Sequence, residues 1–425
     1  MKKEYIVLLF VVFVVTFFGS YVYMQSQLDN DKETNDTVIN NNTVVENKTV
    51  ENKTTGDNKY ENESFDYKVI KKANEGNSSN ILVSPLSIGY ALSMVRDGAD
   101  GKTLSEINSI LGDYKLSKVT NVEKNIGLAN GLFINKSREK EVSKDYINGL
   151  KKDYAAEVIF DPFNGPEVVN NWVNDKTYGM IKKTLDTLDS SYLLVLANTV
   201  AIDVEWGVKF EAESTRSEKF TLLNGTTMDS AMMHASNTVS YIKSDNAQGI
   251  VKSYRTYGDN DLEYIAILPN GDIKEYINNF NGEELNKLLS NIRVRDDKTD
   301  IVLSLPKYTY DYDYRRFKSD LISLGMGTAF DMDNANFSKI GKDVYIDEAV
   351  HKTHIELSEN GTKAAAVTAV AFKANSVFVP EEKEKIIIEF NKPFVYLIKD
   401  KKNDNIWFFG VVYEPMKWED NKKAQ

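Results

Sequence analysis

The chain has 425 residues, no cysteine and a formal net charge of −11. The lack of cysteine excludes disulfides, thiol nucleophiles and cysteine-based metal sites. The negative charge argues against general nucleic-acid binding, which requires a basic surface. Residues 61–425 suffice for one large core, and their mixed helix and strand patterns predict a single α+β domain.

An apolar run occupies residues 5–24, shortly after Lys2 and Lys3 and shortly before several acidic residues. Twenty such residues are about enough to cross a bilayer as a helix, and the lysines place the N-terminus inside. We therefore expect residues 1–24 to be an uncleaved transmembrane anchor that contacts the membrane through residues 5–24. The alternative is a cleaved signal peptide. Signal peptidase prefers small residues before the cleaved bond, and bulky Phe17 and Phe18 lie just before the small pair Gly19-Ser20, which is unfavourable for cleavage.

Residues 25–60 form a polar segment in which Val-Glu-Asn-Lys-Thr occurs twice in succession, starting at Val45 and Val50. Such a composition buries too little apolar surface to fold, so the segment is predicted to be a disordered tether. The domain would then sit on the extracellular face, or be secreted if the leader is cleaved. Acceptor triplets for N-glycosylation fit a glycoprotein stalk, but they also arise by chance in an Asn- and Thr-rich linker; they begin at Asn35, Asn41, Asn47 and Asn52.

Three helix starts can be read from the capping residues of the following domain. Ser84 is a good N-cap with a proline after it, and this helix should end at Gly98. Thr103 and Glu106 have the spacing of a capping box for the next helix. Pro166 should open a third.

Long apolar or alternating runs predict the strands. The run over 192–204 is typical of a buried central strand. Further strands are predicted at 262–268, 301–310, 344–357, 386–399 and 406–413.

Signatures of catalysis are incomplete in this chain. Gly101-Lys-Thr lacks the upstream glycine of a phosphate loop. Asp331-Met-Asp lacks the glycine and closing glutamate of a calcium loop. His351 and His354 fall on opposite faces of a strand and cannot share a metal. We expect no enzyme activity, cofactor, metal site or small-molecule substrate.

The segment from Glu359 to Ala371 reads Glu-Asn-Gly-Thr-Lys-Ala-Ala-Ala-Val-Thr-Ala-Val-Ala. Strands that stay in a core normally use bulky residues, and loops normally use turn residues, whereas this segment uses neither. If it is extended, Lys363 falls on the solvent-compatible face and the residues on the other face are small. The pattern indicates an exposed loop that can become a strand; its inward-facing residues would be Thr362, Ala364, Ala366, Thr368 and Val370.

This segment resembles the reactive-loop hinge of the serpins, a family of suicide protease inhibitors. Four other motifs resemble serpin segments and occur in the family's order, over roughly residues 60–415: Asn80-Ile-Leu-Val-Ser-Pro-Leu-Ser-Ile; Asn170-Asn-Trp-Val-Asn; Ala197-Asn-Thr-Val leading to Trp206 and Phe210; and Phe390-Asn-Lys-Pro-Phe with Phe409-Gly-Val-Val-Tyr-Glu-Pro.

The resemblance implies the serpin fold, in which a large central sheet is accompanied by further sheets, about eight or nine helices and an exposed reactive-centre loop. It implies a shutter beneath the parting strands, made of Ser84, Ser87, Asn198 and His351, and a breach at Trp206. Without the resemblance, Ser84 could be explained as a helix cap and Trp206 as an ordinary core residue. The hinge residues that it implies are Glu359, Gly361, Thr362, Ala364, Ala365 and Ala366.

The resemblance further implies a monomeric suicide inhibitor of an extracellular serine protease. The protease would be trapped as a covalent acyl-enzyme when the cleaved loop inserts as a strand. Counting seventeen residues from Glu359 places the bait bond between Asn375 and Ser376. The loop is several residues longer than usual, so Lys373 and Phe372 are alternates. Lys363 stands where the family usually has Glu. Inhibition of a cysteine protease, which Asn375 would suit, and a non-inhibitory binding role are the other functions considered.

Overall fold

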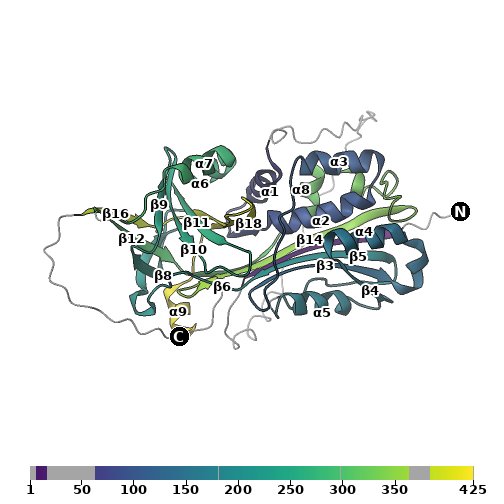
Figure 1. Cartoon of the computed structure of the whole chain (residues 1–425), viewed down its shortest axis with the longest axis horizontal. Helices are drawn as coiled ribbons and strands as arrows, with labels where there is room; N and C mark the ends of the chain where they lie inside the picture. The colour runs from purple at the N-terminus through teal and green to yellow at the C-terminus, as the bar shows by residue number, and fades with distance from the viewer. Residues whose placement is uncertain (1–5, 17–62, 180, 297, 363–382, 425) are drawn as a thin grey trace, which may run out of the picture.

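Three β-sheets and the helices around them form the fold of this computed structural model (Figure 1). The structure describes residues 6–16, 63–179, 181–296, 298–362 and 383–424. Helices and largely antiparallel sheets are mixed along the chain, which confirms the predicted α+β class.

The largest sheet has the order β4-β3-β5-β1-β14-β15-β6, and β13 also pairs with β14. Its strands are β1 (Ile6–Thr16), β3 (Ile126–Asn135), β4 (Glu157–Asp161), β5 (Tyr192–Ile202), β6 (Val204–Glu205), β13 (Tyr308–Asp313), β14 (Val344–Leu357) and β15 (Gly361–Thr362).

The second sheet has the order β2-β18-β17-β11-β10-β9, and the third has the order β16-β12-β8-β7. Their strands are β2 (Ile81–Val83), β7 (Arg216–Thr221), β8 (Thr227–Ser236), β9 (Ser240–Lys243), β10 (Ala247–Ser253), β11 (Leu262–Pro269), β12 (Thr299–Pro306), β16 (Glu384–Glu389), β17 (Phe394–Asp400) and β18 (Ile406–Val412).

Helices cover both faces of the largest sheet (Figure 1). One face carries α2, which lies against β5 and β1, and the other carries α5, whose Val169 and Val173 pack in a separate apolar cluster with Val195 of β5. The helices are α1 (Phe65–Asn74), α2 (Pro85–Gly98), α3 (Gly101–Leu111), α4 (Lys144–Tyr154), α5 (Glu167–Lys176), α6 (Ile273–Asn279), α7 (Gly282–Ser290), α8 (Phe317–Ser323) and α9 (Trp418–Ala424).

Capping was predicted correctly for α2 and incorrectly for α3. The Ser84 hydroxyl accepts a hydrogen bond from Ser87 N at 3.1 Å, as expected of an N-cap. Helix α3 starts two residues before the predicted capping box, with Asp100 as its N-cap. Thr103 instead accepts a hydrogen bond from Asn336 N. The side chain that was predicted to cap the helix therefore binds a distant segment of the chain.

Two predicted strands are each divided in the structure. The run 301–310 divides at Lys307 into β12 and β13, and the run 386–399 divides before Pro393 into β16 and β17. Both breaks lie beside a proline, Pro306 or Pro393. Because proline cannot donate a hydrogen bond to a neighbouring strand, the chain passes from one sheet to another at each of these two points.

Residues 6–16 were expected to belong to a membrane-spanning helix, and the structure instead forms strand β1 from them. The segment is a continuous run of Ile, Val, Leu and Phe ending in Thr. Such a run suits a strand enclosed in a sheet as well as a helix in lipid, and its β-branched residues favour the strand. In the ranges that the structure describes, no helix is both long and apolar enough to span a membrane.

Candidate functional site

The candidate site is the turn between β14 and β15 together with the strands on either side. Strand β15 pairs with β14 through Leu357 and Thr362, and with β6 through Gly361 and Glu205. Both pairings are antiparallel, so the chain leaves β14, turns over residues 358–360 and starts back between β14 and β6. The turn therefore places Gly361 and Thr362 inside the largest sheet, between β14 and β6.

Trp206, the predicted breach residue, holds this turn. Its indole Nε1 donates to Ser358 O at 3.0 Å, and its backbone N donates to Asn360 O at 3.0 Å. The ring is 1% exposed and stacks on Tyr254 with centroids 4.5 Å apart. A tryptophan that served only as core filler would not donate its indole N–H to the turn, so the Trp206 side chain helps to position the turn.

Glu359 is buried, and both its carboxylate and its backbone carbonyl have polar partners. Lys307 Nζ lies 2.9 Å from its carboxylate, and the Thr215 hydroxyl donates to it at 2.7 Å. Phe210 N donates to the Glu359 carbonyl at 2.9 Å. A buried carboxylate needs such partners. Lys307 and Thr215 carry no sequence signal for this role, because they lie far from Glu359 along the chain.

Gly361 and Thr362 fit closely against the neighbouring strands. A Cβ added at Gly361 would lie 2.2 Å from Val204 O, and its φ of +153° is also unfavourable for other residues. Thr362 is fully buried, and its hydroxyl lies 2.5 Å from the Tyr254 hydroxyl. The inward position predicted for Thr362 agrees with this burial.

A buried lysine lies beneath the turn. Lys252 Nζ is 5.4 Å from the centroid of the Trp206 ring and 4.6 Å from that of Phe210, and it donates to the Thr238 hydroxyl at 3.3 Å. Burial lowers the pKa of Lys252 to about 8. Aromatic faces attract a cation, yet they replace only part of its lost hydration.

The four predicted shutter residues meet under β5 and β14. Ser84 N lies 3.3 Å from His351 Nε2, and the Ser84 hydroxyl donates to Trp407 O at 2.6 Å. Ser87 Oγ contacts the Asn198 side-chain oxygen. All four residues are fully buried. They join α2 to both strands, so any change in the spacing of those strands must disturb these hydrogen bonds.

Asn130 of β3 extends this cluster and was not identified from the sequence. Its side-chain oxygen accepts from Asn198 Nδ2 at 2.7 Å, and its own Nδ2 donates to Tyr154 O at 2.8 Å. His354, by contrast, faces away from His351 and contacts Asp311 at 2.6 Å. Only the pairing register brings Asn130 opposite Asn198, and sequence alone does not reveal that register.

Several predicted residues lie outside the described residues, namely Ala364, Ala365, Ala366, Phe372, Lys373, Asn375 and Ser376. Across the ranges that are described, no group of three or more His, Asp and Glu side chains could hold a metal ion. What the structure shows at the site is the end of β15, held between β14 and β6 by strand pairing.

Replacing Asn198 with Leu should lower the free energy of unfolding by about 2–4 kcal/mol, because Ser87 and Asn130 each lose a buried partner. The measurement is thermal and urea unfolding of the variant beside the wild type. The neighbouring Thr199→Val is the matched control. The Thr199 hydroxyl is buried without a hydrogen-bond partner within the described structure, so a methyl group in its place should be neutral or stabilising. Equal losses in both variants would contradict a specific role for the Asn198 bonds.

Lys252→Met should raise the free energy of unfolding at pH 7 by about 1–3 kcal/mol, because it removes a charge that burial disfavours. Above pH 8 the folded wild type loses this proton while the unfolded chain keeps it up to about pH 10.5. Wild-type stability should therefore rise with pH in that window, and the advantage of the variant should shrink.

Unfolding midpoints at pH 7 and pH 10 measure the effect of Lys252→Met, with Lys151→Met on the exposed surface of α4 as the control. A pH-independent gain, or an equal gain in the control, would show that charge burial at Lys252 is not the cause.

Known proteins are similar to this chain in sequence and in fold. A family model for serpins (serine protease inhibitors) matches residues 60–415. An uncharacterised serpin-like protein of Thermococcus kodakarensis is 30% identical over 373 residues, covering 83% of this chain and 84% of that protein. The leukocyte elastase inhibitor of Xenopus tropicalis is 28% identical over 383 residues, covering 83% of this chain and 97% of that protein.

The fold is shared as well. The crystal structure of the thermophilic serpin tengpin in its native state superimposes with a TM-score of 0.70 at 32% identity, covering 87% of this chain and 96% of tengpin. This likeness confirms the predicted serpin fold. Because the family model spans most of its length, the chain belongs to the serpin family.

Proposed function

We propose that this serpin is a suicide inhibitor of an extracellular serine endopeptidase and acts by inserting its reactive loop into the largest sheet. The observation that best supports this is the position of β15, which already pairs with β14 on one side and β6 on the other. The next residues are small, reading Lys-Ala-Ala-Ala-Val-Thr-Ala-Val-Ala from Lys363. Side chains of this size meet little resistance in a packed sheet.

Insertion provides the force that traps a protease. Cleavage of the loop at Asn375-Ser376 would leave the protease acylated on the newly formed end. About fourteen inserted residues at roughly 3.3 Å each would carry it about 45 Å. Because catalysis fails when the reacting groups move by about 1 Å, the acyl-enzyme would persist. Such a mechanism needs an uninserted state that is kinetically trapped above the inserted one.

Two other functions have an observation in their favour. Asparagine at position 375 would suit an Asn-specific cysteine protease, so cross-class inhibition is the second candidate. The largest sheet already contains β1 between β5 and β14, which favours a non-inhibitory binding protein. The small residues after Thr362 argue for inhibition over a binding role, because a loop that never inserts has no need of them.

The location that we propose is the extracellular face of a membrane. The lysines before residues 5–24 and the acidic residues after them favour that orientation. Residues 25–60 would act as a glycosylated tether for a monomeric domain. Secretion after signal cleavage is the alternative location.

A panel of serine and cysteine proteases tests the proposed function. We expect at least one serine protease to form a covalent complex that survives denaturing electrophoresis. Mass spectrometry of the released C-terminal peptide should place the cleaved bond after Asn375. Clean cleavage by every protease without a complex, and without a gain in thermal stability, would favour the binding role instead.

Thr362→Arg should convert the inhibitor into a substrate, because Thr362 is fully buried against Tyr254 and leaves no room for a guanidinium group. We expect the yield of stable complex to fall at least tenfold while cleavage of the loop continues. The quantity measured is the ratio of complex to cleaved serpin.

Lys363→Arg is the matched control for Thr362→Arg, since strand alternation places position 363 on the solvent-compatible face. The control should keep the complex yield of the wild type. An undiminished yield in Thr362→Arg would count against insertion at this end of the sheet.

A further inference from the structure

Strand β1 fills the gap between β5 and β14 along most of its length. It pairs in parallel with β5 from Val7 to Thr16 and with β14 from Ile6 to Val15. In Figure 1 it is the purple strand that runs between these two. The backbone edges of β5 and β14 that face the gap are therefore satisfied by the N-terminal segment.

The ends of β1 and β15 meet within this gap. Thr16 of β1 is paired with Ile202, the last residue of β5, and Thr362 of β15 is paired with Val204, the first residue of β6. Since only Asp203 separates Ile202 from Val204, the two strands approach each other from opposite ends of the same strand position. We call this position, between β14 on one side and β5 and β6 on the other, the track. Only the position opposite Asp203 lies between the two paired stretches, so β1 occupies the places that residues from 364 onward would need.

The register shows which residues compete. Thr362 is antiparallel to Leu357, so each later loop residue would pair one residue earlier on β14. Position 365 would then pair with His354, and position 375 with Val344, the first residue of β14. His354 is paired with Val15 and Val344 with Ile6.

We propose that residues 6–16 are an intramolecular competitor for the reactive loop and that inhibition requires their withdrawal from the sheet. This inference rests on the proposed function, because it concerns the same insertion. It assigns the N-terminal apolar segment a regulatory role in addition to any membrane contact. The loop cannot insert while β1 is paired, so covalent complex forms only from the fraction of molecules in which β1 has left the sheet.

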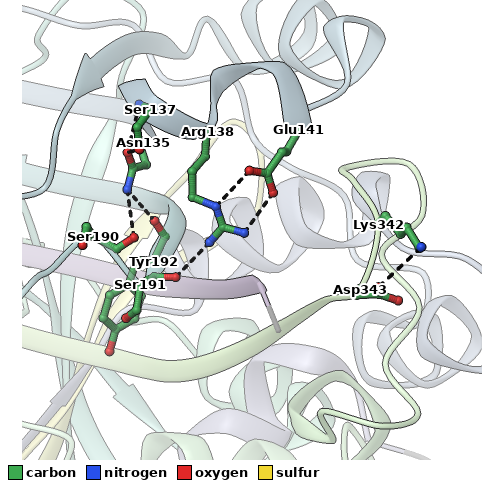
Figure 2. Close-up of polar contacts among 9 residues, drawn as sticks. All are labelled: Asn135, Ser137, Arg138, Glu141, Ser190, Ser191, Tyr192, Lys342 and Asp343. Atoms are coloured by element: carbon green, nitrogen blue, oxygen red, sulfur yellow. Dashed lines mark hydrogen bonds and ion pairs between the residues drawn. The ribbon is translucent and has the colours of Figure 1, made fainter. Parts of the chain in front are cut away.

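The end of the sheet where β1 starts is held by contacts that do not involve β1 (Figure 2). Asn135 Nδ2 donates to Tyr192 O at 3.1 Å, and Arg138 donates to Ser191 O at 3.0 Å while paired with Glu141. The Tyr192 hydroxyl reaches across to Asp347 of β14 at 3.2 Å. These bonds fix the start of β5 relative to β3 and β14, so the track has a defined width there.

An engineered disulfide tests the inference in the full chain, which has no cysteine of its own. Val11 pairs with Ala197 in the register, so Val11→Cys with Ala197→Cys should bridge β1 to β5. The matched control joins Val11→Cys to Val195→Cys, whose partner in the register is Leu9. Two residues of offset put these Cα atoms roughly 8 Å apart, too far for a disulfide.

We expect mass spectrometry to find the disulfide in the first pair and free thiols in the control. The oxidised first pair should give at least tenfold less covalent complex with a susceptible protease than the same protein after mild reduction. The control should give the same yield in both states. Thiols that stay free in both pairs, or equal yields from the oxidised and reduced first pair, would overturn the inference.

A failure of the proposed function looks different. In that case neither the wild type nor the reduced variants form a complex with any protease, and competition for insertion is excluded with it. The disulfide in the first pair, which is read by mass alone, would still report whether β1 occupies the track.

Discussion

The backbone edges of β5 and β14 lie one strand apart, and neither can stay unpaired inside a buried sheet. Nearly every residue of β5 is fully buried with β1 in place, and an unpaired backbone edge in such an interior costs free energy. The sheet must therefore close the gap or accept a strand from elsewhere in the chain. Two segments border this gap, β1 from one end and β15 from the other. Which of the two segments fills the gap decides whether the reactive loop can insert.

The polar clusters at the gap make sense under this constraint. Buried side chains such as Asn198 and His351 would destabilise a core unless they were hydrogen-bonded, and replacing them with apolar residues would bind the strands to α2 without directional preference. Hydrogen bonds instead define one spacing of β5 and β14 and lose their energy when that spacing changes. At the turn, Trp206 and Lys307 do the same for residues 358–360. The sheet is thus held in one discrete arrangement at two places, which suits a structure that changes state abruptly.

Local chemistry explains what could be predicted from the sequence. The cap at Ser84, the buried strand starting at Tyr192 and the strand over 344–357 each depend on residues within a few positions, and the structure contains all three. The family motifs supplied the residues of the shutter and breach, which no local pattern would have linked. The bait bond lies outside the described residues and stays a prediction.

Contacts between distant segments explain what could not be predicted. Asn130 and Asn198 meet because of a strand register, and Lys307 meets Glu359 because two sheets join there. Residues 6–16 expose a deeper ambiguity. A continuous apolar run has no period, so its pattern alone does not distinguish a lipid-embedded helix from an enclosed strand. The environment offered to the run decides between them.

The competition for the track can be weighed by comparing how each segment would be held there. The reactive loop follows β14 through a turn of three residues, whereas β1 is joined to the domain through residues 17–62. Closing the longer connection costs only about 2 kcal/mol more, because the entropy of loop closure grows with the logarithm of length. Antiparallel pairing also favours the loop slightly over the parallel pairing of β1.

Amino-acid composition, by contrast, favours β1 over the reactive loop as the strand in the track. Residues 6–16 consist of Ile, Val, Leu and Phe with one Thr, and each such residue contributes about 1.5–3 kcal/mol when fully buried. Over the same length, residues 365–375 of the loop offer five alanines, two valines and one phenylalanine among eleven residues, so the loop cannot match β1 in apolar area. A segment of this kind leaves the sheet readily only if it finds another apolar environment, and a bilayer is one that accepts twenty such residues as a helix. Because the same residues satisfy both environments, attachment to a membrane and competence to inhibit would be coupled through a single stretch of chain.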